Sequence, residues 1–373
     1  MKELRIKDIC DKGSSNLKQK DVEGKTGQYP VYGASGVISY IDSYHQEEDY
    51  IAIVKDGSGI GRVTFMPAKS SIIGTMQYIL PKEGFNINYI GYCLQSLDLS
   101  KYKQGAAIPH IYFRDYGERF VKVTEDLNEQ QSIVDYLDSA FAKIDAMKAN
   151  AEKALNEAKT LFQASLKKML EPKDGWEEKK LEEMSEIQSG LAFKSTQFKK
   201  IGKYQVIRMG NVRPGLIRYN ESPVFIESID ENKIEKALLK VGDMIITQTG
   251  SRNKRDYGFT VLIDKENLLL NQRIARIRVI NTITNKYLLY YSWTDYFRDQ
   301  YFANEGGTVG QGNVGIDAIR CAIIPCPPLS EQQSIVTSLD SLKSKVDRLQ
   351  DNFDKISQEC DALKQAILRQ VFE

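Results

Sequence analysis

The chain has 373 residues, of which 51 are Lys or Arg and 50 are Asp or Glu, so its formal charge is +1. This balance excludes a polycationic nucleic-acid coat, and an apolar content of 42% supports sizeable cores in about two or three domains. No run approaches the roughly 18 apolar residues of a membrane span, and the charged N-terminus is not that of a signal peptide. We therefore expect a folded cytoplasmic protein without membrane contact.

Cysteine and histidine usage argues against a metal site. The five cysteines are scattered and odd in number, which predicts reduced thiols rather than a disulfide framework or zinc site. The two histidines, His45 and His110, exclude a three-histidine site. The run Gly310–Gly315 fits G-x-G-x-x-G, but a strand-like segment ending in prolines follows where a dinucleotide site needs a helix. We predict no catalytic residue, no metal ligand and no cofactor bound by this chain.

The first block, residues 1–126, alternates short apolar runs with Gly, Asn, Asp and Lys. Segments 50–54, 61–65 and 76–80 have the composition of strands, and 86–98 has a helical pattern. The mixture predicts an α+β domain with a mostly antiparallel, twisted sheet. The glycine-rich run 54–62 lets backbone amides approach a phosphate, and a plain hairpin is the alternative. Its candidate DNA contacts are Lys55, Ser58 and Arg62.

Residues 127–171 contain neither Pro nor Gly and predict one long helix, roughly 60 Å at 1.5 Å per residue. Six basic and seven acidic residues within it exclude the basic helix of a zipper-type DNA-binding protein. The segment 172–177 then provides a hinge into the second block.

The second block, residues 172–328, has the same character, with strands expected at 204–208, 242–248, 258–263 and 273–280 and a helical pattern at 284–300. Its most basic segment is 249–258, TGSRNKRDYG. Arg and Asn side chains read guanine and adenine edges, whereas Lys and Ser suit phosphates. The candidates are Ser251, Arg252, Asn253, Lys254 and Arg255, and a solvated hairpin tip is the equal alternative.

Further polar clusters stand at strand ends and near the ends of both blocks. Each is also compatible with an ordinary surface position. The DNA-contact candidates among them are Arg208, Asn211, Gln272 and Arg273 at strand ends, and His110, Arg114, Gln311 and Asn313 near the block ends.

Residues 329–373 predict a second long helix that repeats the first. The two 45-residue segments align without a gap at an offset of 202, with 20 identical positions. The chain is therefore a tandem duplication of a variable block and a helix. In the second copy, apolar residues alternate at spacings of three and four, which is the pattern of a coiled-coil seam. The seam comprises Leu339, Leu342, Val346, Leu349, Phe353, Ile356, Cys360, Leu363 and Ile367, matched in the first copy by Leu137, Ala140, Ile144, Met147, Ala151, Ala154, Ala158, Leu161 and Ser165.

The two seams differ in bulk near their middles. Ala151 and Ala154 are small, whereas Phe353 and Ile356 are large. Antiparallel packing would set the small side chains against the large ones. We expect an intramolecular antiparallel coiled coil, because the blocks between the helices let the chain return, and an intermolecular dimer through the same seam is the alternative.

The sequence resembles the specificity subunits of type I restriction–modification systems. The resemblance is carried by LNEQQSIVDYLD (127–138) and PPLSEQQSIVTSLD (327–340), each opening a long helix after a variable block. It is extended by GDMIITQTGS (242–251), LNQRIARI (270–277) and YPVYGASGVISYID (29–42).

The resemblance implies two target recognition domains, 1–126 and 172–328, and two spacer helices, 127–171 and 329–373. It also implies a non-catalytic subunit that reads a bipartite, asymmetric site in double-stranded DNA. Two methylation subunits and restriction subunits would be its partners and would bind S-adenosylmethionine, ATP and Mg. A coiled-coil scaffold or interaction protein without nucleic acid is the alternative.

Overall fold

The computed structural model describes residues 1–105, 108–280 and 282–373. The chain forms two compact units: unit 1 comprises Met1–Lys153 and Asp351–Glu373, and unit 2 comprises Ala154–Gln350. Each unit contains part of both long helices, so the division into two recognition domains and two spacer helices stays a prediction. Within the described ranges, no helix combines the length and the apolar character that a membrane crossing requires.

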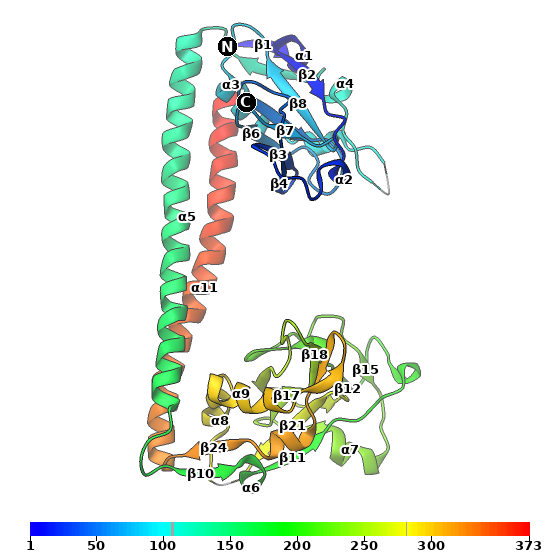
Figure 1. Cartoon of the computed structure of the whole chain (residues 1–373), viewed down its shortest axis with the longest axis vertical. Helices are drawn as coiled ribbons and strands as arrows, with labels where there is room; N and C mark the ends of the chain where they lie inside the picture. The colour runs from blue at the N-terminus through cyan, green and yellow to red at the C-terminus, as the bar shows by residue number, and fades with distance from the viewer. Residues whose placement is uncertain (106–107, 281) are drawn as a thin grey trace. The chain divides into compact units, whose positions relative to one another are not determined.

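Unit 1 is a mixed α+β structure in which strands are divided among small sheets (Figure 1). The sheets have the orders β1-β9, β2-β8-β5-β6 and β4-β3-β7, and β3 pairs with β7 in parallel. The single sheet expected for the block is thus replaced by three. The elements are β1 (Lys2–Arg5), α1 (Ile6–Ile9), β2 (Cys10–Ser14), α2 (Gln19–Val22), β3 (Tyr29–Gly33), β4 (Gly36–Ile41), β5 (Tyr50–Val54), β6 (Val63–Met66), β7 (Ser71–Ile72), β8 (Met76–Pro81), α3 (Ile87–Gln95), the 3-10 helix η1 (Leu99–Tyr102), α4 (Phe113–Tyr116) and β9 (Phe120–Val123).

Strand β5 explains this division, because both of its faces are buried. Ile51 and Ile53 belong to the core that includes Tyr89 of α3, whereas Tyr50 and Ala52 belong to a second core. Alternate side chains of a strand point to opposite faces. Because every residue of β5 is apolar, the strand contributes side chains to two cores, one on each face. The strand therefore packs between α3 on one side and the smaller sheet on the other.

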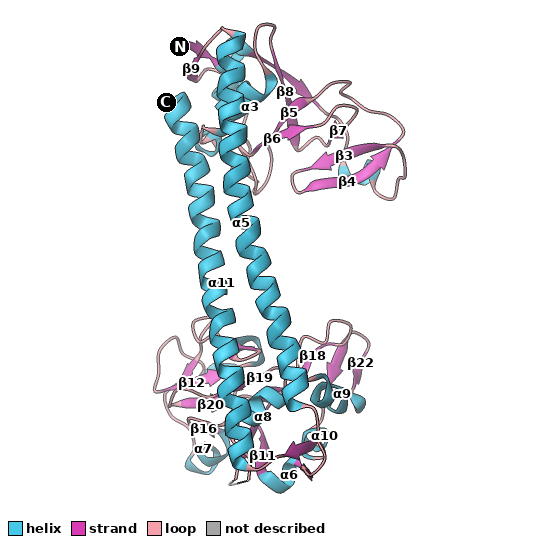
Figure 2. Ribbon diagram, turned by 90° about the vertical axis from the view of Figure 1, so that its left-hand side faces the viewer, coloured by secondary structure: helices cyan, strands magenta, loops and turns pink. Residues whose placement is uncertain are grey.

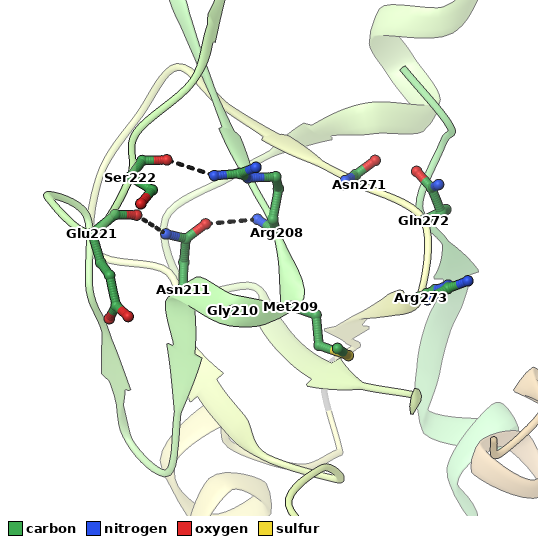
Figure 3. A pocket seen from close by; sticks show the side chains of 9 residues that line it. All are labelled: Arg208, Met209, Gly210, Asn211, Glu221, Ser222, Asn271, Gln272 and Arg273. Carbon is green, nitrogen blue, oxygen red and sulfur yellow. Dashed lines mark hydrogen bonds between the residues drawn. The ribbon is translucent and has the colours of Figure 1, made fainter. Parts of the chain in front are cut away.

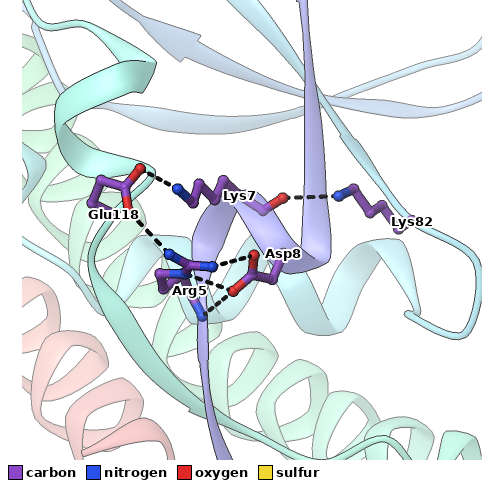
Figure 4. A network of polar contacts seen from close by, with 5 residues as sticks. All are labelled: Arg5, Lys7, Asp8, Lys82 and Glu118. Carbon is purple, nitrogen blue, oxygen red and sulfur yellow. Dashed lines mark hydrogen bonds and ion pairs between the residues drawn. The ribbon is translucent and has the colours of Figure 1, made fainter.

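The start of unit 1 is fixed by a surface network of charged groups (Figure 4). The Arg5 guanidinium donates to both carboxylate oxygens of Asp8, at 2.9 and 3.2 Å, and lies 3.5 Å from Glu118. Lys7 also pairs with Glu118, and its carbonyl accepts from Lys82 Nζ at 2.9 Å. The network connects α1 to the segments before β9 and after β8. Because these side chains are exposed, its contribution is orientation rather than much stability.

Unit 2 repeats this plan. Its four-stranded sheet has the order β11-β21-β17-β19, which corresponds strand by strand to β2-β8-β5-β6, and β10-β24 corresponds to β1-β9. Further sheets have the orders β15-β12-β20-β16, β13-β14 and β18-β23-β22. The elements are β10 (Glu177–Lys180), α6 (Leu181–Met184), β11 (Ser185–Ser189), η2 (Ser195–Gln197), β12 (Tyr204–Ile207), η3 (Met209–Asn211), β13 (Val212–Arg213), β14 (Leu216–Ile217), β15 (Phe225–Ile226), α7 (Glu231–Ala237), β16 (Leu238–Leu239), β17 (Met244–Thr247), β18 (Thr249–Ser251), β19 (Thr260–Leu262), β20 (Leu268–Leu270), β21 (Ile274–Val279), α8 (Asn285–Tyr291), α9 (Asp295–Ala303), β22 (Gly306–Thr308), β23 (Gln311–Asn313), α10 (Ile316–Arg320) and β24 (Ile323–Cys326).

The duplication extends to individual contacts on the long helices α5 (Leu127–Leu170) and α11 (Leu329–Phe372). Tyr92 of α3 donates to Asp138 of α5, and Tyr290 of α8 donates to Asp340 of α11 at 2.7 Å. The two carboxylates stand at the repeat offset of 202. The tandem repeat predicted from the helices is therefore confirmed in the blocks as well.

The two long helices pack against each other in antiparallel directions, which confirms intramolecular pairing (Figures 1 and 2). In unit 1, Lys364 Nζ lies 2.6 Å from Asp145 and Lys148 Nζ lies 3.6 Å from Asp361. In unit 2, Lys159 Nζ donates to Gln350 Oε1 at 2.9 Å. The residue numbers on one helix rise as those on the other fall, as antiparallel packing requires.

The predicted seam of α5 is wrong at Met147, Ala154 and Leu161, which are exposed. Met147 and Leu161 are each 58% exposed. The buried stripe instead passes one residue later than the predicted Ala140, Ala154 and Leu161, through Phe141, Leu155 and Phe162.

The helix surface facing the domains accounts for this shift. Phe141 contacts the Tyr92 ring at 5.5 Å, and Phe162 contacts the Trp293 ring at 6.4 Å. The buried stripe of α5 thus packs against both the partner helix α11 and the domains. On α11 the predicted seam is mostly buried or half-buried, although Leu363 is 48% exposed.

Candidate nucleic-acid interface

A polar cavity of about 420 Å³ in unit 2 brings together candidates from two strand ends (Figure 3). Arg208 and Asn211 follow β12, and Gln272 and Arg273 form the turn between β20 and β21. Strands β12 and β20 pair in parallel, so their carboxyl ends meet at one edge of the sheet. The cavity therefore collects candidates that lie about 60 residues apart in the sequence.

Two of these side chains are engaged within the unit. The Asn211 amide nitrogen donates to the carbonyls of Arg218 and Glu221 at 3.2 and 2.8 Å, and its oxygen accepts from Arg208 N at 3.0 Å. Arg208 Nη2 donates to Ser222 O at 2.5 Å. Asn211 has no free amide hydrogen for a ligand, so it shapes the loop that forms one wall of the cavity.

The opposite wall offers free side chains. Gln272 and Arg273 are both exposed, and neither side chain has a hydrogen bond or ion pair to the part of the chain that the structure describes. Arg273 has a φ of 69°, a left-handed conformation that costs an ordinary residue free energy. The turn thus holds an unpaired guanidinium and carboxamide at the cavity.

A second cavity, of about 680 Å³, shares Met209 and Gly210 with the first. Its other lining residues include Ser251 of β18 and Gln311 of β23. Six of the predicted contacts therefore line two adjoining cavities: Arg208, Asn211, Gln272, Arg273, Ser251 and Gln311.

The basic residues after β18 point in two different directions. Arg252 turns inward: its Nη2 donates to Gly306 O at 2.9 Å, and its Nε lies 3.7 Å from Glu305. Asn253, Lys254 and Arg255 are exposed, and the Arg255 guanidinium stacks on the Phe302 ring at 4.8 Å. Arg252 thus supports the β22–β23 hairpin, whereas the three residues after it face solvent.

Tyr257 supports the same hairpin from within. Its hydroxyl donates to Glu305 Oε1. Burial, and then the hydrogen bond and charge of Glu305, raise the pKa of Tyr257, so the hydroxyl stays protonated and keeps donating at neutral pH. Arg252, Tyr257 and Glu305 form a polar base under the hairpin.

In unit 1 the candidates centre on Asp56, which sequence reasoning had not selected. Its carboxylate pairs with Lys55 Nζ and lies 2.7 Å from His110 Nδ1. Arg114 stacks on Tyr112 at 4.8 Å, and Tyr112 stacks on His110 with 6.3 Å between ring centroids. The result is a partly exposed stack of guanidinium, phenol and imidazole held by a carboxylate.

The remaining candidates of unit 1 lie apart from this stack. Ser58 is exposed in the turn after β5. Arg62 donates to Ala34 O at 2.9 Å and lines a separate cavity of about 430 Å³. Within the described residues, neither Ser58 nor Arg62 has a hydrogen bond or ion pair with His110, so unit 1 does not gather its predicted contacts as closely as unit 2.

Backbone pairing connects the residues of each group. In unit 1, Asp56 pairs with His110, and His110 also pairs with Gln104. In unit 2, β18 pairs with β23, and β23 pairs with β22. Unit 2 thus has a three-stranded sheet after β17, whereas the described residues of unit 1 form two isolated bridges at His110 after β5.

Sequence comparison identifies the family. A family described as "Type I restriction modification DNA specificity domain" matches residues 1–157 and, a second time, residues 173–357.

Three curated relatives carry the name type I restriction enzyme specificity subunit. The MjaVIII subunit of Methanocaldococcus jannaschii is 27% identical over 370 residues, covering 92% of this chain and 85% of that protein. The EcoBI subunit of Escherichia coli is 27% identical over 213 residues, covering 57% and 41%. The EcoKI subunit of Escherichia coli strain K12 is 24% identical over 262 residues, covering 66% and 55%. The chain thus spans about two fifths of the EcoBI subunit and about half of the EcoKI subunit.

Solved structures share the fold. A chain from a study titled "Structural basis underlying complex assembly and conformational transition of the type I R-M system" has a TM-score of 0.69 at 16% identity, covering 98% of this chain and 96% of that one. The HsdS subunit from Thermoanaerobacter tengcongensis has a TM-score of 0.52 at 15% identity, covering 98% and 95%. With two matched domains that account for most of its sequence, the chain belongs to the type I restriction modification DNA specificity domain family.

Proposed function

We propose that this chain is the DNA-reading subunit of a type I restriction–modification complex and that each unit reads one half of a bipartite, asymmetric site. The observation that supports this best is the repeated four-stranded sheet of the two units, with different polar side chains following its corresponding strands β5 and β17. Unit 1 carries Asp56 and His110 there, whereas unit 2 carries Gln311 and Asn313. Similar backbones with different hydrogen-bonding groups suit two half-sites of different sequence.

Exposed cations on unit 2 also support this proposal. Lys254, Arg255 and Arg273 are exposed on unit 2. Phosphate contacts orient a protein on DNA, while base-edge contacts set its sequence preference. In this proposal Lys254, Arg255 and Arg273 contact the phosphates of the DNA backbone. The polar side chains of the strands face the base edges.

The long helices are proposed to dock the methylation subunits. Tyr136, Met147 and Leu161 on α5 are 55 to 58% exposed, and Leu363 on α11 is 48% exposed. Apolar side chains outside the seam suit packing against helices of another subunit. Adenine methylation with S-adenosylmethionine, and cleavage with ATP and Mg, belong to the partner subunits in this proposal, which works on DNA in the cytoplasm.

Methylation mapping tests the proposal. A host lacking its own adenine methylation receives the chain together with its methylation subunits, and modified adenines are mapped by single-molecule sequencing. A two-part motif should be methylated, and the signal should vanish when only this chain is omitted. Methylation of the same motif without the chain would refute the proposal and favour a scaffold role.

Exchange of residues 1–126 for the first block of another family member sharpens the test. One half of the motif should change while the other stays. The core of unit 1 includes Leu137 and Ile144 of α5 and Phe372 of α11, so the incoming block must also fit these side chains. A change in both halves would mean that the units do not read independently.

A further inference from the structure

The sheet β18-β23-β22 of unit 2 has two chemically distinct faces. A Cβ atom added to Gly312 would lie 2.2 Å from the hydroxyl of Tyr257 and 2.2 Å from Glu305 Oε1. One added to its strand partner Gly250 would lie 2.6 Å from Asp256 and 2.8 Å from the Tyr257 ring. The face of the sheet that carries Gly250 and Gly312 therefore packs directly against Tyr257. Any larger residue at either position would displace Tyr257.

The neighbouring residues must point the other way, because side chains alternate along a strand. Gln311 pairs with Ser251 on one side and Thr308 on the other. Asn313 pairs with Thr249 on β18. These cross-strand rows carry hydroxyl and carboxamide groups without a charged side chain.

The two carboxamides are available to a ligand. Gln311 and Asn313 are exposed, and neither side chain has a hydrogen-bond partner in residues 1–105, 108–280 and 282–373. Gln311 also lines the 680 Å³ cavity together with Ser251. The surface is thus polar, uncharged and open.

Arg252 holds the hairpin that carries these groups at both its turn and its base. Arg252 N donates to Gly310 O at 3.2 Å, and the Arg252 side chain donates to Gly306 O at 2.9 Å. Gly310 has a φ of 86°, which closes the turn, and Val309 at the tip is fully exposed. With the hairpin held at both ends by Arg252 and Val309 exposed at its turn, its outer face can meet a groove without reorganising.

We infer that the hairpin β22–β23 enters the major groove of the half-site read by unit 2, with Gln311 and Asn313 each contacting the edge of one adenine. Gln and Asn carboxamides match the N6 donor and N7 acceptor of adenine, and the major groove admits a two-stranded ribbon. Phosphates offer acceptors only, so they would leave the carboxamide oxygens unpaired. Arg252 and Tyr257 act as positioning residues. This inference rests on the proposed function.

The variants Gln311→Ala and Asn313→Ala test it in the complex with the methylation subunits. Loss of a bidentate contact should reduce discrimination at one A·T position by about 5- to 150-fold, so other bases appear there in the methylated motif. The other half-site should be unchanged. The slope of affinity against salt should also be unchanged, because no phosphate contact is removed. Asn220→Ala, an exposed amide on the same unit outside both cavities, is the matched control.

Three outcomes separate the possibilities. A motif unchanged in both variants, with wild-type DNA binding, overturns the adenine contact and leaves the proposed function intact. Relaxation at a G·C position overturns the assignment to adenine. A wild-type complex whose methylation does not depend on this chain overturns the proposed function itself. Circular dichroism of each variant establishes that a changed motif does not come from a lost fold.

Discussion

The side-chain oxygen of Gln332 accepts a hydrogen bond of 2.9 Å from the backbone nitrogen of Thr284, the residue that caps α8. The amide nitrogen of the same Gln332 donates to Thr282 O and Pro327 O, at 3.1 and 2.9 Å. Gln130, at the equivalent position, accepts from Asn86 N at 2.7 Å and donates to the carbonyls of Gly84 and Thr124. Both glutamines have no exposed surface.

Replacement of this glutamine should be costly. In Gln332→Ala, a buried donor and buried acceptors lose their partner, and we expect roughly 2–4 kcal/mol of lost unfolding free energy. Chemical denaturation followed by circular dichroism measures it. Gln333→Ala removes the exposed neighbouring amide and should change stability by no more than about 0.5 kcal/mol. Equal effects in the two variants would contradict a special role for the buried side chain.

Arg273→Ala should weaken binding to all DNA sequences alike. The guanidinium is exposed and unpaired among the described residues, so it suits a phosphate. Loss of one phosphate contact reduces the slope of log affinity against log salt by about 1. Fluorescence anisotropy at several salt concentrations gives the slope. Arg218→Ala is the control, because Arg218 pairs with Glu221 at 3.1 Å. A changed motif with an unchanged slope would instead make Arg273 a base contact.

Thiol reactivity should report the burial of the cysteines. Cys321 is exposed, whereas burial raises the pKa of Cys93 to about 12 and that of Cys326 to about 11. The thiolate is the reacting species, so a raised pKa leaves little of it near pH 8. A disulfide reagent should therefore show one fast thiol in the native protein. Cys321→Ser should abolish that fast phase, and its survival would show that another cysteine is accessible.

Insertion of seven residues into each long helix, near Ala151 and near Phe353, tests whether the helices set the spacing of the half-sites. A full heptad preserves the seam and lengthens each helix by about 10 Å. The spacer between the two half-sites of the methylated motif should then grow by about 3 base pairs. Some affinity should be lost, because DNA twist also rotates one half-site relative to the other. Insertion into α5 alone should destabilise the pair. An active complex with an unaltered gap would restrict the helices to docking.

The long helices and most strands were predictable because their periodicity is local. The positions of the buried stripe on α5 were not predictable, because Phe141 and Phe162 pack against aromatic rings of the blocks as well as against α11. The helix expected at 284–300 is broken, because the Thr294 hydroxyl caps the nitrogen of Phe297 at 3.4 Å and starts α9. A serine or threonine within a helical pattern was the available signal.

At the candidate site, composition identified Arg252 and Gln311 but not their roles. Charge favoured Arg252 as a reader, yet its guanidinium supports the hairpin. The direction of Gln311 depends on the pairing of β23 with β18 and on the glycine face against Tyr257. Asp56 and Tyr112 had no sequence signal of their own, because their importance comes from contact with His110.

The two faces of the sheet β18-β23-β22 have a consequence for evolution. Changes at Gly250 or Gly312 would disturb Tyr257 beneath them, so selection for folding constrains those positions. Gln311 and Asn313 point outward and are exposed, so packing does not constrain their side chains in this way. If Gln311 and Asn313 contact bases as inferred, single substitutions in this outward row would change the target sequence while the fold is inherited intact.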